Sequence, residues 1–221
     1  MSMTPQLSEL PSPAATAVEA QIRKERVVAI LRLPDPLQGV DICRALAEAG
    51  LTVMEIAVNH PEALRALERA RAAVDESVAL GAGTVLDVPT VQRVRDCGGT
   101  FCVSPCLDAE VVNATRAAGL LPIPGVFSPT EVVAANRLGL RLLKLFPAEP
   151  SGIGYLRALR GPFPQIGFIP TGGIEIHAVD TWLTAGAVAV GLGSSLVGRG
   201  EDPAVIPSRA REILRRVEDA S

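Results

Sequence analysis

Residues 53–58 read Val-Met-Glu-Ile-Ala-Val, and residues 79–83 read Ala-Leu-Gly-Ala-Gly. A longer amphipathic stretch, rich in Ala, Leu, Arg and Glu, separates these two short apolar runs and begins near Pro61. Short apolar runs of this kind are typical of buried strands, and an amphipathic stretch between two of them is typical of a helix. The segment therefore predicts a strand, a crossover helix and a second strand parallel to the first.

The same alternation continues along the whole chain. Eight apolar runs are predicted to be strands, namely residues 27–31, 53–58, 79–83, 100–103, 121–123, 140–146, 166–169 and 188–192. Helices are predicted to begin near Asp35, Pro61, Pro89, Asp108, Pro129, Gly152, Glu175 and Pro203. Several of these are Pro or Asp, which the first turn of a helix prefers. A further helix is expected around residues 15–24, ahead of the first strand.

Eight strand and helix units in series predict an α/β protein, a (β/α)8 TIM barrel with an N-terminal helix. A strand, a crossover and a parallel strand wind right-handedly, and eight such units can close into a barrel. An open flavodoxin-like or Rossmann sheet is the alternative, but no G-x-G-x-x-G follows the first predicted strand. The 221 residues, 48% of them hydrophobic, suffice for one core. We expect a single domain over residues 1–221, with residues 1–14 as a flexible leader.

Composition argues against several classes of partner. The net charge is −3 and aromatic residues make up 3% of the chain, so no basic stripe with interleaved aromatics predicts nucleic-acid binding. There is no secretory signal and no run of eighteen apolar residues, so we expect a cytoplasmic protein without a membrane partner. The four cysteines, at positions 43, 97, 102 and 106, are expected to remain thiols. A zinc pair at Cys102 and Cys106 is the alternative, but no further His or Cys lies near enough in sequence to complete it.

Polar residues inside apolar runs are the candidates for chemistry, because barrel enzymes react at the carboxyl ends of their strands. They are Glu55 in the second run, Lys144 among leucines and Phe146 in the sixth, and Thr84 at the end of Gly-Ala-Gly-Thr. An ammonium is costly to bury, which favours the neutral amine that an imine-forming nucleophile needs. The alternative is a structural lysine paired with a carboxylate. Glu55 would lie within reach of Lys144 inside a barrel and could carry protons.

Two glycine turns follow the last two predicted strands. Pro170-Thr-Gly-Gly173 and Gly191-Leu-Gly-Ser194 would present unobstructed backbone N–H groups where barrels often bind phosphate. The alternative is that both are ordinary turns, since glycine is common in turns of every kind.

Four further polar residues lie at the ends of predicted strands or the starts of helices. Asn59 ends the second run and could hydrogen-bond a carboxylate or hydroxyl, although it could equally be a turn residue. Arg32 ends the first run and is a candidate anion anchor, with a surface arginine as the alternative. His60 and His177 are expected to have surface or capping roles and not catalytic ones.

At these positions the chain resembles the 2-keto-3-deoxy-6-phosphogluconate (KDPG) and 4-hydroxy-2-oxoglutarate (KHG) aldolase family, over residues 27–199. The matching segments are Val28-Ala-Ile-Leu-Arg32, Met54-Glu-Ile56, Gly81-Ala-Gly-Thr-Val85, Val103-Ser-Pro105, Ile123-Pro-Gly-Val126, Lys144-Leu-Phe-Pro-Ala-Glu149, Gly161-Pro-Phe163, Pro170-Thr-Gly-Gly173 and Gly193-Ser194. Their shared order is specific, although no single segment is. The resemblance implies a class I aldolase on a (β/α)8 barrel, usually a homotrimer, which uses no metal and no cofactor.

The resemblance also implies roles for individual residues. Lys144 would form a Schiff base with a small, phosphorylated 2-keto acid, and Glu55 would move protons. Thr84, Pro105 and Phe146 would line the pyruvate half of the site, and Thr171, Gly172, Gly173 and Ser194 would meet the phosphate. The expected reaction is cleavage of KDPG to pyruvate and glyceraldehyde 3-phosphate, with KHG, which yields pyruvate and glyoxylate, as a further substrate.

One position departs from the best-known KDPG members, which carry an arginine four residues after the glutamate. This chain has Asn59 there, which resembles the 6-phosphogalactonate (KDPGal) branch, whereas Phe146-Pro-Ala-Glu149 and Pro170-Thr-Gly-Gly173 resemble the gluconate branch. Arg32 is the expected replacement cation for the substrate carboxylate. KDPGal aldolase is thus the alternative activity. A barrel that only binds a phosphorylated metabolite, or an isomerase whose lysine stabilises charge, is the alternative of a different class.

Overall fold

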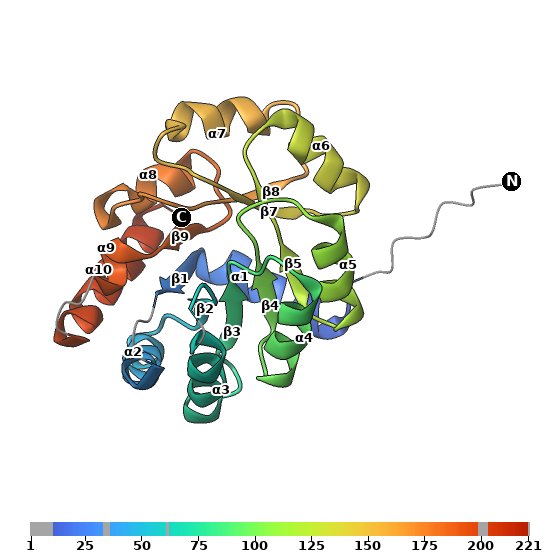
Figure 1. Cartoon of the computed structure of the whole chain (residues 1–221). Helices are drawn as coiled ribbons and strands as arrows, with labels where there is room; N and C mark the ends of the chain where they lie inside the picture. Colours follow the sequence, from blue (N-terminus) through green and yellow to red (C-terminus); the bar gives the residue numbers. More distant parts are fainter. Residues whose placement is uncertain (1–10, 33–35, 61, 199–202, 221) are drawn as a thin grey trace, which may run out of the picture.

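A computed structural model of the chain describes residues 11–32, 36–60, 62–198 and 203–220. Strands and helices alternate along the described residues (Figure 1). The strands are β1 (Val27–Leu31), β2 (Val53–Ala57), β3 (Ala79–Gly83), β4 (Phe101–Val103), β5 (Leu121–Ile123), β6 (Gly125–Val126), β7 (Leu142–Leu145), β8 (Gly167–Pro170) and β9 (Val190–Leu192). The helices are α1 (Pro13–Glu25), α2 (Pro36–Glu48), α3 (Ala63–Ala73), α4 (Val88–Asp96), α5 (Ala109–Ala117), α6 (Pro129–Arg137), α7 (Gly152–Arg160), α8 (Val179–Thr184), α9 (Ser194–Val197) and α10 (Ile206–Asp219), with short 3-10 helices η1 (Ile176–Ala178) and η2 (Pro203–Val205).

All strand pairings among the described residues are parallel, and they form two sheets. One sheet has the order β5-β4-β3-β2-β1-β9, and the other has the order β6-β7-β8. Pro124 separates β5 from β6, and at the other junction Thr171 forms a parallel bridge with Gly191. Each of the eight predicted apolar runs overlaps a strand, which confirms the predicted alternation, and the two-residue β6 lies outside these runs. The fold is therefore α/β with a parallel, curled sheet.

The helix starts follow local capping chemistry. The Asp87 side chain accepts a hydrogen bond from the Thr90 backbone N–H (2.8 Å) at the start of α4, and Ser128 and Glu131 form a capping box at α6. The starts predicted near Asp35 and Pro61 lie outside the described residues. Near residues 175 and 203 the chain first forms η1 and η2, and α8 and α10 follow. The short α9 had no signal of its own in the sequence.

The first helix begins earlier than the sequence pattern predicts. Ser12 is its N-cap and accepts a hydrogen bond from the Ala15 N–H (3.0 Å), and Pro13 occupies the first turn. Residues 13 and 14 of the expected leader therefore belong to α1, and residues 1–10 lie outside the described part. The Ser12 hydroxyl also donates to the carbonyl oxygen of Gly119 (2.7 Å), just ahead of β5.

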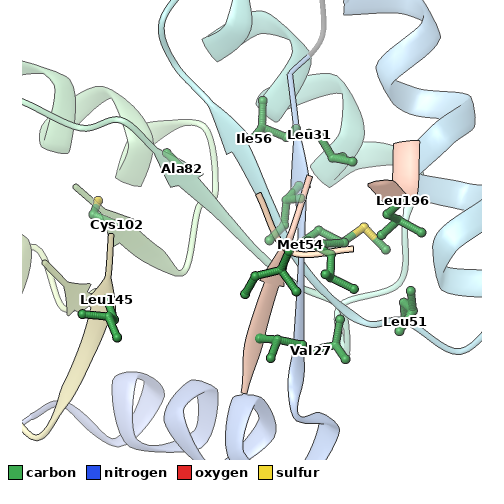
Figure 2. Packing of buried hydrophobic residues seen from close by; sticks show 14 of the residues in the cluster. Val27, Leu31, Leu51, Met54, Ile56, Ala82, Cys102, Leu145 and Leu196 are labelled. Carbon is green, nitrogen blue, oxygen red and sulfur yellow. The ribbon is translucent and has the colours of Figure 1, made fainter. Parts of the chain in front are cut away.

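Alternation along each strand separates two packing surfaces. On β2, Met54 and Ile56 belong to the large cluster that the strands form with the helices, whereas Val53 belongs to a smaller inner cluster. Figure 2 shows part of the large cluster, with labelled residues Val27, Leu31, Leu51, Met54, Ile56, Ala82, Cys102, Leu145 and Leu196. Because successive side chains of a strand point to opposite faces, Glu55 shares the inner face with Val53. By the same rule Lys144 on β7 faces inward.

Helix α1 covers the end at which the strands begin. Its buried side chains Ala15, Val18 and Ile22 belong to the inner cluster, together with Val53 and Phe101 of the sheet. Glu25, at its last turn, accepts hydrogen bonds from the Thr52 backbone N–H (2.5 Å) and from the Thr52 hydroxyl (2.6 Å). Burial raises the pKa of Glu25 above its usual value of 4.5. The helix is thus attached to the start of β2 by both apolar and polar contacts.

Two features bear on the predicted partners. Within residues 11–32, 36–60, 62–198 and 203–220, no helix has the length and apolar character needed to cross a membrane. The cysteines are free thiols, and burial raises the pKa of Cys43 and of Cys102 to about 12. Cys102 packs in the large cluster whereas Cys106 is exposed, so their positions give no support to a zinc pair.

Truncating α1 where it enters the core should destabilise the protein. Ile22 is fully buried, and replacing a buried Ile by Ala typically costs about 2–5 kcal/mol. We expect Ile22→Ala to lower the free energy of unfolding by that amount in urea titrations. Lys24→Ala, at an exposed position of the same helix, should change it by less than about 0.5 kcal/mol. Equal stability of the two variants would show that α1 is not part of the core.

Candidate active site

A small pocket lies among the inward-facing side chains of the strands. Its volume is about 10 Å3, close to the least space that holds a water molecule. The lining residues are Val28, Ile30, Glu55, Val103, Ile123, Lys144, Ile169, Thr171 and Gly191. Glu55, Lys144 and Thr171 are the polar members of this set. The structure therefore brings the two residues predicted to carry the chemistry into one largely apolar pocket.

Strand register accounts for the arrival of these side chains in the pocket. Glu55 on β2 pairs with Ile30 on β1 and with Gly81 on β3. Lys144 on β7 pairs with Gly125 on β6 and with Ile169 on β8. Paired residues of neighbouring strands point to the same face of a sheet. Residues from both sheets thus converge on the interior.

Glu55 is a buried carboxyl whose pKa is perturbed. Its exposed fraction is 3%, and burial raises its pKa above the usual 4.5, although the positive charges of Lys144 and Arg32 act in the opposite direction. Loss of hydration disfavours the carboxylate more than these two charges favour it. Among the described residues, no hydrogen bond or ion pair joins Glu55 to Lys144. A carboxyl of this kind holds its proton to a higher pH and can act as a proton donor as well as an acceptor.

Lys144 is held in a position suited to a nucleophile. It is 7% exposed, and its Nζ lies 5.0 Å from the centroid of the Phe146 ring. Ile123 and Ile169 line the pocket beside it. The ring of the half-buried Phe146 in turn lies against Gly172, where an added Cβ would be 3.1 Å from a ring carbon. Apolar groups therefore restrict the motion of the amine and limit its contact with water.

The turn after β8 and the start of α9 lie near the pocket. Thr171 is 4% exposed, and its hydroxyl donates to the carbonyl oxygen of Ile169 (3.2 Å). Gly172 and Gly173 have φ angles of 99° and 77°, a left-handed conformation that glycine adopts at little cost. Thr171 also pairs with Gly191, the middle residue of β9, which brings the two predicted phosphate turns together.

Arg32 lies beside the second of these turns. Its side chain is exposed, and its Nη1 would be 3.3 Å from a Cβ added at Gly193. Ser194, the first residue of α9, is also exposed. Burial raises the pKa of Glu55, and the positive charge of Arg32 partly opposes that rise. The guanidinium is thus available to an anion at the rim of the pocket.

Asn59 lies elsewhere. Strand β2 ends at Ala57, and the exposed Asn59 lines a different pocket, of about 250 Å3, with His60, Thr90 and Arg93 among its other walls. The structure does not place Asn59 among the residues that line the Lys144 pocket. His60 accepts a hydrogen bond from the Glu62 N–H (3.3 Å) through Nδ1, a local contact at the start of α3. His177 is exposed in η1.

Thr84 and Pro105 lie on the loops that follow β3 and β4. Thr84 has a φ of 62°, an uncommon conformation for a β-branched residue and one often found at functional sites. The carbonyl oxygen of Pro105 would be 2.3 Å from a Cβ added at Gly125, the residue paired with Lys144. Thr84 thus follows the strand that pairs with β2, which carries Glu55. Pro105 lies against β6, which pairs with the strand that carries Lys144.

The prediction from sequence omitted most of the pocket wall. Val28, Ile30, Val103, Ile123 and Ile169 were expected only as strand residues, yet all line the pocket. The two-residue spacing of Val28 and Ile30 on β1 was the available signal. Glu149 was not predicted as a site residue either. It packs closely on the turn at Gly173, where an added Cβ would be 2.4 Å from the Cβ of Glu149.

Comparisons with known proteins identify the family of the chain. The family model described as KDPG and KHG aldolase matches residues 18–205. A protein of Rhizobium meliloti, described as a probable 2-dehydro-3-deoxy-6-phosphogalactonate aldolase, is 36% identical over 186 residues, which are 83% of this chain and 87% of the relative. The 2-dehydro-3-deoxy-phosphogluconate aldolase of Pseudomonas aeruginosa is 33% identical over 205 residues, 90% of this chain and 92% of the relative.

A solved structure is similar over nearly the whole chain. It is KDPG aldolase from Legionella pneumophila with pyruvate captured at low pH as a covalent carbinolamine intermediate. The TM-score is 0.78 at 27% identity, and the match covers 96% of this chain and 100% of that one. The family match spans well over half of the sequence, and the relatives named here are aldolases. The chain therefore belongs to the KDPG and KHG aldolase family of carbon–carbon lyases.

Proposed function

We propose that this protein is a class I aldolase that cleaves KDPG through a Schiff base on Lys144. The observation that carries the proposal is the burial of the Lys144 amine and the Glu55 carboxyl in one small, largely apolar pocket. A nucleophilic amine needs to be free of its proton, and a neighbouring acid must deliver and accept protons as bonds to carbon form and break. The carbinolamine captured in the Legionella relative supports the same chemistry here.

The proposed reaction begins when the neutral Lys144 amine attacks the C2 ketone of the substrate. Glu55 donates and removes protons while the carbinolamine loses water to give a protonated imine. The C3–C4 bond then breaks as the C4 hydroxyl loses its proton, and the bonding electrons move to the imine nitrogen. This step releases glyceraldehyde 3-phosphate and leaves an enamine. Protonation at C3 and hydrolysis by water release pyruvate and restore the amine.

The other parts of the site are assigned to the two ends of the substrate. Thr84, Pro105 and Phe146 are proposed to contact the pyruvate half. The phosphate is proposed to meet Thr171, Gly172, Gly173 and Ser194. Arg32, beside Gly193, would supply a cation at an anionic end of the substrate.

We also propose that the two sheets form one closed (β/α)8 barrel in a single domain. The short gap at Pro124 and the Thr171–Gly191 bridge support closure, because each joins the edge of one sheet to the edge of the other. A homotrimer is proposed from family membership, and light scattering would test it.

The Schiff base should be directly detectable. We expect pyruvate and borohydride to attach a reduced adduct to Lys144 in the wild-type protein. Lys144→Ala and Lys144→Arg should give no adduct and should lower turnover by at least about a thousandfold, since the nucleophile is lost. The Arg variant keeps a long basic side chain but has no nucleophilic amine, so it serves as the matched control. If the wild-type protein stays unmodified, the Schiff base is ruled out. An unmodified protein that still converts a phosphorylated substrate would be an isomerase, and one that converts none would be a binding protein.

Substrate preference separates the branches of the family. We expect kcat/KM for KDPG to exceed the values for KDPGal and for KHG, because the segments around residues 146–149 and 170–173 resemble the gluconate branch. The 36% identity with the Rhizobium protein and the presence of Asn59 favour KDPGal as the second candidate. Side-by-side kinetics with the three substrates measure this directly. A higher kcat/KM for KDPGal would assign the chain to the galactonate branch.

The raised pKa of Glu55 makes stability depend on pH. Burial raises the pKa of the folded-state carboxyl, so stability is fully present below the unfolded value of 4.5 and declines as the pH rises through the folded-state value. Gln at this position has no charge to bury. We therefore expect the unfolding free energy of Glu55→Gln, relative to that of the wild type, to increase as the pH rises. In acid this difference should become independent of pH. Urea titrations across pH would show no such trend if Glu55 were ionised at no cost.

A further inference from the structure

Gly83, the last residue of β3, lies in unusually close contact with Glu55. A Cβ added at Gly83 would be 1.6 Å from Oε1 of Glu55, 2.4 Å from Cδ and 2.7 Å from Cγ. These are the three atoms nearest to that position. Gly83 is not among the residues with positive φ, so its backbone conformation is open to other residues. The carboxyl group of Glu55, and not the backbone, is what requires a glycine here.

The strand register explains the contact. Glu55 pairs with Gly81, whereas Gly83 pairs with Ala57 two residues further along β2. The Glu55 side chain thus extends toward the carboxyl ends of the strands and crosses the next inward position of β3. Gly81 has a different role, because a Cβ there would be 2.5 Å from the Phe101 ring in the inner cluster. One glycine leaves space for the core and the other leaves space for the carboxyl.

A second polar residue of the pocket is accommodated in the same way. A Cβ added at Gly191 on β9 would be 2.3 Å from Oγ1 of Thr171, and both residues line the pocket. A strand glycine often marks the close approach of another group. Glu55 and Thr171 therefore each lie over a strand glycine, which has no Cβ at the point of contact.

We propose that Gly83 is a positioning residue for proton transfer. Because Gly83 has no Cβ, the Glu55 carboxyl can lie directly over β3 and extend into the pocket that Lys144 also lines. The proposal rests on the proposed function of Glu55 and Lys144. A methyl group at position 83 would need ordinary van der Waals separation of at least 3.4 Å, so the carboxyl would have to move by more than about 1 Å. A displacement of that size can lower a rate by about 10²-fold. Gly83 has no side chain of its own that could contact the substrate.

Rates of imine formation test the proposal. We would mix each variant with pyruvate, quench with borohydride at successive times, and measure the adduct by mass spectrometry. Gly83→Ala should form the adduct about 100-fold more slowly than the wild type, with little change in the pyruvate concentration at half-saturation. Gly154→Ala is the matched control, since Gly154 is exposed in α7, its φ is not positive, and no atom lies within 4 Å of its added Cβ. That variant should match the wild type.

A double variant shows whether Gly83 acts through Glu55. Glu55→Gln should slow imine formation by about 10²-fold or more, and adding Gly83→Ala to it should slow the reaction little further. If the double variant were slower than each single variant by the product of the two separate factors, the proposal would be overturned, because Gly83 would then act independently of Glu55. A Gly83→Ala rate equal to that of Gly154→Ala would also overturn it. If the wild type itself forms no adduct, the proposed function fails before the positioning role is tested.

Stability measurements keep the proposal testable if Gly83→Ala folds poorly. Glu55→Ala removes the three atoms nearest to the added methyl. Gly83→Ala should therefore shift the urea midpoint strongly in the wild-type background and hardly at all in the Glu55→Ala background. Equal shifts in both backgrounds would show that the methyl obstructs something other than Glu55, and the proposal would be wrong.

Discussion

The burial of two ionisable side chains inside a ring of aliphatic ones is the constraint on which this site depends. Water stabilises an ammonium and a carboxylate far better than Ile123 or Ile169 can. For the Glu55 carboxyl the protonated, uncharged form is cheaper to bury than the carboxylate. The raised pKa of Glu55 expresses this cost. The same desolvation that works against folding thus provides groups that can exchange protons.

Much of the fold could be predicted because it follows from two periodicities. Short apolar runs located the strands except the two-residue β6, and amphipathic stretches located most helix starts. A proline near the first turn marked the starts of α4 and α6. The predicted barrel also placed Glu55 within reach of Lys144, because both lie in apolar strand runs. These predictions needed only local sequence, since period and capping are local properties.

The remaining features depended on contacts between distant segments. Asn59 follows the end of β2, and the direction of a loop side chain is set by its neighbours, here His60 and Arg93, and not by strand period. The division into two sheets depends on which backbone groups pair at Pro124 and Thr171. The positioning role that we infer for Gly83 required coordinates as well, although a glycine at alternate positions of a buried strand was a visible hint.

Helix α1 has a practical consequence for handling the protein. It covers the end where the strands begin and is fixed there by Ser12 and Glu25, whereas Thr84, Gly172 and Ser194 all follow the opposite ends of their strands. A support or fusion partner coupled to the first turn of α1 would therefore be remote from the loops that carry Thr84, Gly172 and Ser194. Immobilisation through that helix should leave these loops facing the surrounding solution.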